Sequence, residues 1–159
     1  MDLALDVCAH SRKPVVRQRT LDDCMTCALA MFAGRGYDEV IAAAQSMAPD
    51  YAAGELMTHA MLRRIAHGWG MALLSSIYMD WRHPGIVGVV SKTIANCGHA
   101  LFWDGARLID PGGSGAYDLD YVQAHALEFT QRAGDLTAVI ALEQQMQPAT
   151  RAVSRAEYF

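Results

Sequence analysis

Two cysteines three residues apart stand at the start of an apolar run, in the stretch RQRTLDDCMTCALAMFAG. A cysteine can act as a nucleophile, bind a metal or form a redox pair, and each role needs different partners elsewhere. Cys24 lies in the first turn of an expected helix, where free N–H groups stabilise a thiolate, the reactive form of cysteine. Cys27 lies one turn further along, among apolar residues. Position therefore favours Cys24 as a nucleophile and Cys27 as a packing residue.

A nucleophilic cysteine needs a general base and a group that orients the base. His99 opens one apolar segment, and a second apolar segment ends at Asp110, immediately before Pro111. Between them, Asp104-Gly105 is suited to a type I′ turn, which predicts an antiparallel hairpin. Such a hairpin brings His99 and Asp110 to the same end, within hydrogen-bonding reach. We therefore predict His99 as the base and Asp110 as its orienting group, although Asp-Pro-Gly is also a common turn sequence.

A nucleophilic site for acyl chemistry also needs a donor that stabilises the oxyanion, beside the N–H of the nucleophile. Gln18 stands six residues before Cys24, in the segment that enters the expected helix. Its side-chain amide can fold back beside the thiol, so Gln18 is the candidate donor.

The remaining pattern places helices before strands. Gly34 or Gly36 would end the first helix, and acidic residues open the second. Expected helices cover 20–36, 37–48 and 55–67, followed by strands at 71–79, 85–92 and 99–110, a short helix at 119–129 and a strand at 136–144. Helices first and an antiparallel sheet second is an α+β order.

Composition limits the class of protein. The chain has 159 residues, enough for one domain over 1–159 whose core needs no disulfide or metal, with a lead-in at 1–13 and a flexible tail from about 145 to 159. A net charge of −4 argues against nucleic-acid partners. No apolar run reaches the roughly 18–20 residues of a membrane span, and the first residues lack a basic signal-peptide region. We therefore expect a cytoplasmic protein with no membrane partner.

Three segments together resemble the bacteriocin-processing (C39-type) cysteine peptidases, a papain-like family. QRTLDDCMTCALAM, residues 18–31, is similar to the active-site segment of that family, with Gln six residues before the cysteine of an Asp-Cys pair. GELMTHAMLRRIAHGWG, residues 54–70, is similar to its glycine-terminated helix, and HALFWDGARLIDP, residues 99–111, to its His-strand and Asp-Pro element. The resemblance extends over about residues 14 to 113.

The resemblance implies a papain-like fold, with a helical half followed by an antiparallel-sheet half. It also implies a cysteine peptidase or amide hydrolase that acts on a peptide or protein substrate through a covalent thioester and needs no cofactor. By motif, Cys24 is the nucleophile, His99 the base, Asp110 its orienting group and Gln18 the oxyanion donor. The family usually has glycine directly after its nucleophile, where this chain has Met25. The sequence also lacks a transporter segment, so the leader-peptide specificity of the family's transporter domains is not carried over.

Other interpretations of the same residues remain open. Cys24, Cys27, Cys97 and His99 form a set of four donors compatible with tetrahedral zinc, and Cys8 and His10 offer further ligands. Against zinc, Cys24 and Cys27 stand in a helical pattern rather than a tight turn. A thioredoxin-like redox pair would need a βαβ pattern nearby, which the sequence lacks. Met25 also leaves open a catalytically silent module that binds peptides. A papain-like fold can equally host acyl transfer.

Overall fold

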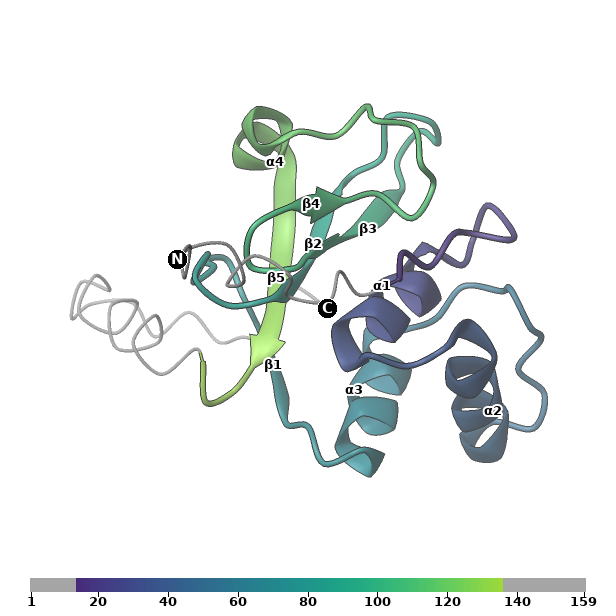
Figure 1. Cartoon of the computed structure of the whole chain (residues 1–159). Helices are drawn as coiled ribbons and strands as arrows, with labels where there is room; N and C mark the ends of the chain where they lie inside the picture. The colour runs from purple at the N-terminus through teal and green to yellow at the C-terminus, as the bar shows by residue number, and fades with distance from the viewer. Residues whose placement is uncertain (1–13, 136–159) are drawn as a thin grey trace, which may run out of the picture.

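The computed structural model describes residues 14–135 of the chain. The expected lead-in at 1–13, strand at 136–144 and tail at 145–159 lie outside these residues. Within them, three helices come first and the sheet follows, as the α+β prediction requires (Figure 1). The elements are α1 (Cys24–Ala33), α2 (Tyr37–Met47), α3 (His59–Gly68), β1 (Leu73–Ser76), β2 (Gly85–Val90), β3 (Gly98–Trp103), β4 (Leu108–Ile109), α4 (Leu119–His125) and β5 (Ala126–Arg132).

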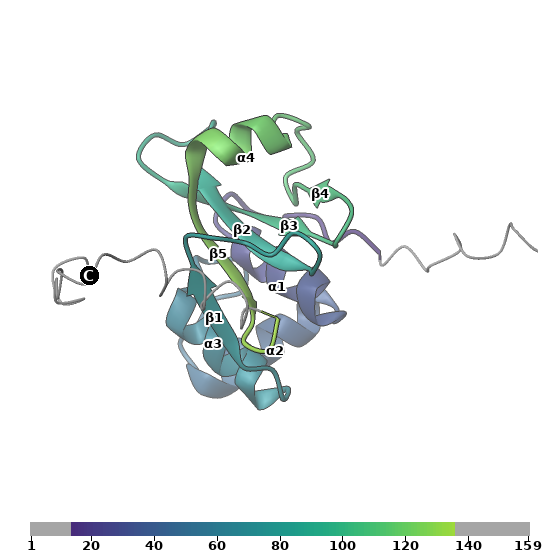
Figure 2. The same ribbon diagram turned by 90° about the vertical axis from the view of Figure 1, so that its left-hand side faces the viewer.

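The strands form one antiparallel sheet in the order β1-β5-β2-β3-β4. The strand that is last in the described chain, β5, therefore lies between β1 and β2. Figures 1 and 2 both show α1, α2 and α3 gathered together, with α4 at the opposite end of the molecule from α2 and α3. Helix α1 packs against β3, and this contact joins the helical half to the sheet.

Each face of β3 packs into a different apolar cluster. Ala100 and Phe102 face the larger cluster, in which Phe32 of α1 meets Phe102 edge-on with ring centroids 6.4 Å apart. Leu101 and Trp103 face the smaller cluster, on the other side of the sheet. This alternation follows from the two-residue period of a strand, and burial of both faces explains why β3 is apolar at consecutive positions.

Two helices begin later than predicted. Helix α1 starts at Cys24 rather than near residue 20, because the Asp23 carboxylate accepts hydrogen bonds from the N–H groups of Arg19 and Thr20 and holds the preceding residues in a turn. Its C-terminus agrees with the prediction, since Gly34 adopts the left-handed conformation with φ 66°. Helix α3 starts at His59, after Thr58 caps it.

The helix predicted over 119–129 is wrong at its C-terminal end. Helix α4 ends at His125, and Ala126–Arg132 is strand β5. A capping hydrogen bond from the Tyr121 N–H to the Asp118 carboxylate, 2.7 Å long, fixes the start of α4. In the part of the chain that the structure describes, we find no helix both long and apolar enough to cross a membrane.

Candidate active site

Cys24 is the first residue of α1, and its thiol lies between the helix and the start of β3. The N–H of Ala100 donates a hydrogen bond to the Cys24 sulfur over 3.4 Å, and the residue is 8% exposed. The unpaired N–H groups of the first helical turn add positive potential at the same place. The Cys24 sulfur therefore lies beside an N–H donor and at the N-terminus of a helix.

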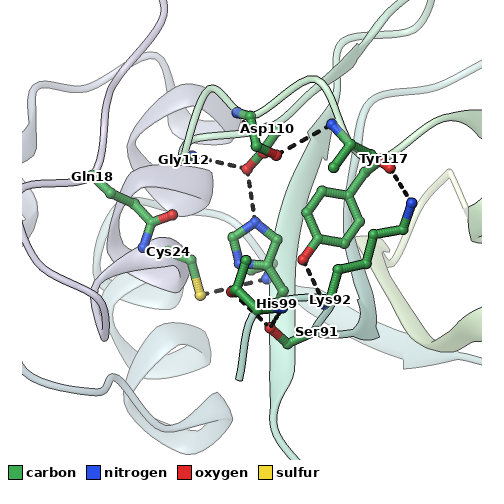
Figure 3. A network of polar contacts seen from close by, with 12 residues as sticks. Gln18, Cys24, Ser91, Lys92, His99, Asp110, Gly112 and Tyr117 are labelled. Atoms are coloured by element: carbon green, nitrogen blue, oxygen red, sulfur yellow. Dashed lines mark hydrogen bonds and ion pairs between the residues drawn. The ribbon is translucent and has the colours of Figure 1, made fainter. Parts of the chain in front are cut away.

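His99, the second residue of β3, lies between Cys24 and Asp110 (Figure 3). The imidazole Nε2 is 2.7 Å from the Asp110 Oδ1, and the Cys24 side chain lies beside the same ring (Figure 3). The structure therefore brings together the three residues that the sequence predicted to be neighbours. One ring nitrogen faces a carboxylate, and the opposite side of the ring faces a thiol.

The hairpin that joins His99 to Asp110 differs from the predicted one in its turn. Strand pairing matches Trp103 with Leu108, so the loop contains four residues, closed by the Asp104 N–H to the Arg107 carbonyl. A two-residue type I′ turn would have paired residues 103 and 106. The difference of two residues keeps every side chain on its predicted face, because the strand period is two. His99 and Asp110 consequently remain neighbours, as a diagonal pair.

A tight turn fixes the Asp110 carboxylate. Its Oδ1 also accepts the Gly112 N–H over 2.8 Å, and its Oδ2 accepts the Ser114 hydroxyl over 2.7 Å and the Ser114 N–H over 3.2 Å. Asp110 therefore both forms the Asp-Pro-Gly turn and binds His99, so the two interpretations of this residue are compatible. Nothing in the sequence alone indicated this role of Ser114.

Burial and hydrogen bonding act in opposite directions on the two titratable partners. Burial alone would lower the pKa of His99, but hydrogen bonds and charge interactions with Cys24 and Asp110 raise it above its ordinary value. Burial would raise the pKa of Asp110, but hydrogen bonds from His99, Ser114 and Gly112 lower it. The pair therefore favours imidazolium beside carboxylate.

Gln18 lies on the other side of the thiol, in the segment that leads to α1 (Figure 3). Its backbone N–H donates to the Pro111 carbonyl over 3.0 Å, so the segment runs beside the turn that holds Asp110. Its amide nitrogen donates to the Thr20 carbonyl over 3.2 Å. An amide nitrogen carries two N–H groups, so this contact occupies only one of them.

Two glycines stand where this segment lies close to the turn. A Cβ atom at Gly112 would lie 3.0 Å from the Gln18 Oε1, and one at Gly113 would lie 2.9 Å from the Arg17 guanidinium. Gly113 also has a φ of +70°, in the region that favours glycine. The Arg17 guanidinium donates to the Asp110 carbonyl over 2.8 Å. Two consecutive glycines thus allow Arg17 and Gln18 to close against the Asp110 turn.

Asp23 organises the chain just before Cys24. The fully buried carboxylate accepts hydrogen bonds from the N–H groups of Arg19 and Thr20, and from the Tyr37 hydroxyl over 2.8 Å. An aspartate directly before a helix commonly caps its N-terminus, but the Asp23 side chain makes no capping hydrogen bond to α1. Its side chain instead points back along the chain, and it connects the turn before Cys24 to the start of α2.

The four proposed zinc donors do not gather in one place. Cys27 is completely buried, and burial raises the pKa of its thiol to about 12, which favours the neutral form. Cys97 is exposed. Within residues 14–135, no group of three or more His, Cys, Asp or Glu side chains is arranged to hold a metal ion, and Cys8 and His10 lie outside the described residues. The donor set therefore does not fit zinc, and Cys27 packs in the larger cluster, as predicted for a core residue.

Met25 and Tyr117 complete the surroundings of the site. Met25 is half-buried and packs against the larger apolar cluster. Tyr117 stacks on the imidazole of His99, with ring centroids 4.8 Å apart and an interplanar angle of 26°. Sequence reasoning missed Tyr117. The only available signal was an aromatic residue shortly after the Asp-Pro turn.

The opposite pKa shifts of His99 and Asp110 predict a pH-dependent contribution to stability. Because the pKa of His99 is raised in the folded state, its protonation stabilises the fold. This contribution is complete below pH 6.5, the ordinary pKa, and is lost as pH rises through the folded-state pKa. A lowered pKa of Asp110 stabilises the fold above 3.8, and the contribution is lost as pH falls through the folded-state pKa. Asp110→Asn should therefore lower the free energy of unfolding by about 1–3 kcal/mol between these pH values.

Urea unfolding of wild type and Asp110→Asn from pH 3 to 9 measures this difference. The matched control is Asp118→Asn, because Asp118 caps α4 by a hydrogen bond to a backbone N–H. Its effect should show no decline above pH 6.5. An Asp110→Asn difference that stays constant up to pH 9 would contradict a stabilising imidazolium–carboxylate pair.

The comparisons with protein families and with curated protein sequences identify no relative of this chain. A search with protein-family models and a search of curated protein sequences each find no match to this chain. The arguments for a function therefore rest on the residues and on the geometry of the site.

Proposed function

We propose that the protein is a papain-like cysteine peptidase or amide hydrolase in which Cys24, His99 and Asp110 form the catalytic triad. The single observation that carries the proposal is the arrangement around His99, whose Nε2 lies 2.7 Å from the Asp110 carboxylate while the ring lies beside the Cys24 thiol (Figure 3). A nucleophile, a base and an orienting group in this order are what covalent acyl chemistry requires.

The proposed reaction has two steps. The Cys24 thiolate attacks the amide carbonyl carbon and forms a C–S bond, and the His99 imidazolium protonates the departing amine as the C–N bond breaks. Water then attacks the thioester while His99 takes one of its protons. The C–S bond breaks, the carboxylic acid product leaves and the thiolate–imidazolium pair is restored.

The oxyanion formed in each step needs donors. The Cys24 N–H, in the first turn of α1, has no acceptor within the helix. The second N–H of the Gln18 amide is the proposed side-chain donor, because the first is held by the Thr20 carbonyl. Asp110 keeps the His99 ring oriented and does not itself take the proton.

Alkylation by iodoacetamide at pH 6, followed by peptide mapping, tests whether Cys24 is activated. An ordinary thiol with a pKa near 8.5 is only about 0.3% ionised at this pH. Exposed Cys97 serves as an internal reference, since access alone would make it react faster than nearly buried Cys24. We expect Cys24 to react about 10- to 100-fold faster than Cys97, a range that allows for the weaker nucleophilicity of a stabilised thiolate.

Two variants complete the test. His99→Ala should remove the advantage of Cys24 over Cys97, whereas Cys27→Ala should preserve it, because Cys27 packs in the core. Equal reaction rates of Cys24 and Cys97 in the wild type would overturn the proposal. A loss of the advantage in Cys27→Ala would support a dithiol or metal site.

Two observations favour a second candidate, a peptidase-like module that binds peptides without cleaving them. Cys24 is only 8% exposed, and Met25 stands where the resembled family usually has glycine. In such a module Cys24 would react no faster than Cys97, so the same labelling experiment separates the two candidates.

A further inference from the structure

We propose that Tyr117 is a positioning residue for His99, whose aromatic face holds the imidazole ring and stabilises its protonated form. This role of Tyr117 is additional to the proposed triad, and only its effect on catalysis depends on the proposed function. The contact that carries it is the stacked arrangement of the two rings, with centroids 4.8 Å apart and planes 26° apart (Figure 3).

The stacking constrains the ring in a direction that the triad leaves free. Asp110 binds the imidazole at one edge and Cys24 lies beside the ring, so both limit its rotation in the ring plane. Tyr117 covers one face and opposes tilting out of that plane. Tyr117 is only 9% exposed, so it also keeps water from that face of the hydrogen-bonded ring.

Tyr117 is itself held from two sides. Its hydroxyl accepts the Lys92 N–H over 2.9 Å, and the Tyr121 ring meets it edge-on with centroids 5.4 Å apart. The Lys92 ammonium lies 4.3 Å from the Tyr121 ring centroid and 5.8 Å from that of Tyr117. A ring fixed by these contacts can fix a neighbour in turn.

One loop carries both Asp110, which binds an edge of the imidazole, and Tyr117, which covers one face. Asp110 begins the loop and is bound by Gly112 and Ser114, and Tyr117 ends it on the face of His99. The segment 110–117 therefore contacts the ring at one edge and one face. One proline, three glycines, a serine and an alanine stand between the two contacts, and these mostly small residues let a short loop make both.

The charge on the imidazole gives this contact a chemical effect. The negative π-face of an aromatic ring attracts a cation within about 6 Å of its centroid. The titratable or charged groups around His99 are Cys24 from α1, Asp110 after β4, Tyr117 in the loop, and Lys92, which Figure 3 places on the far side of the Tyr117 ring. Tyr117 thus favours imidazolium, while its ring stands between the imidazole and the Lys92 ammonium.

NMR titration of His99 in a Cys24→Ala background tests the inference independently of catalysis. Tyr117→Leu should lower the ratio of imidazolium to imidazole at a fixed pH by about 2- to 30-fold, the range that cation–π energies imply. Tyr117→Phe keeps the ring and should restore the ratio to within about 2-fold of wild type. Tyr121→Leu is the comparison variant: Tyr121 contacts Tyr117, and within the described residues the structure records no contact between it and His99, so its effect on the ratio should be smaller than that of Tyr117→Leu.

The same substitutions in the protein with Cys24 intact give a second readout. Tyr117→Leu should slow alkylation of Cys24 at pH 5 by a similar factor, and Tyr117→Phe should not. An unchanged His99 titration in folded Tyr117→Leu, or equal effects of the leucine and phenylalanine variants, would overturn the inference. A shifted titration without any wild-type activation of Cys24 would support the inference and reject the proposed catalytic function.

Discussion

Replacing His99 with alanine is expected to lower kcat/KM for a cleaved peptide by about 10³-fold, within the range that general acid–base catalysis contributes. The imidazole has two tasks in the proposed reaction: it pairs with the Cys24 thiolate and then protonates the departing amine. A loss of about 10³-fold corresponds to about 4 kcal/mol of transition-state stabilisation. The substrate is the peptide that wild type cleaves best in a profiling library and Cys24→Ala does not cleave.

The matched control for this experiment is His67→Ala. His67 is an exposed histidine on α3, and its replacement should leave kcat/KM within about 2-fold of wild type. A folded His99→Ala protein that keeps more than about a tenth of the wild-type activity would contradict the role of His99 as acid and base.

Replacing Asp23 with alanine is expected to lower the free energy of unfolding by about 2–4 kcal/mol, a large part of the roughly 5–15 kcal/mol that stabilises an ordinary domain. The buried carboxylate accepts hydrogen bonds from the Arg19 N–H, the Thr20 N–H and the Tyr37 hydroxyl. Alanine leaves these three donors without their acceptor. Urea unfolding measures the loss.

Two further variants make the Asp23 prediction specific. Asp22→Ala is the neighbouring control, because Asp22 is exposed and should cost less than about 0.5 kcal/mol. Tyr37→Phe should cost about 1 kcal/mol. The double variant Asp23→Ala/Tyr37→Phe should cost less than the sum of the two single variants, because both remove the same hydrogen bond. Additive costs would show that the Asp23–Tyr37 contact contributes nothing.

The adjacency of His99 and Asp110 could be predicted although the turn between them was not. The prediction needed only two antiparallel strands and a register in which His99 and Asp110 lie on the same face of the sheet. The observed pairing is shifted by two residues, which leaves both side chains on that face. Asp104 suggested the type I′ turn, but its carboxylate instead accepts the N–H groups of Ala106 and Arg107 and widens the loop. Side-chain capping of this kind competes with the tighter turn.

Strand β5 was missed because its buried residues are partly polar. Gln131 is completely buried, and its amide bonds to the backbone of Asp80, His83 and Pro84. Thr130 is also buried, and its hydroxyl hydrogen-bonds to Ser75. A pattern based on apolar periodicity cannot detect a strand whose core positions are filled by satisfied polar groups. The helix predicted from residue 119 therefore continued past His125 into residues that form β5.

The residues that support the triad were the least predictable part of the site. Ser114 and Tyr117 stand in a glycine-rich segment whose composition indicates only a loop, and Asp23 stands where a helix cap is expected. Their roles depend on contacts with residues distant in sequence or on the direction of one side chain. Composition and spacing specify neither, whereas the triad could be proposed because each of its members has a chemical role.

Several residues that surround Cys24 in the folded protein are synthesised well after Cys24 itself. Ala100, whose N–H reaches the Cys24 sulfur, is 76 residues further along the sequence, and Arg17 and Asp110 are 93 residues apart. At typical synthesis rates, about 4–15 s pass between the addition of Cys24 and that of Ala100. The growing chain therefore emerges with a cysteine that has neither its imidazole nor its carboxylate partner. Cys24 acquires these partners only after the later strands have been synthesised and the sheet has formed. The proposed catalytic arrangement is therefore absent from the shorter nascent chain.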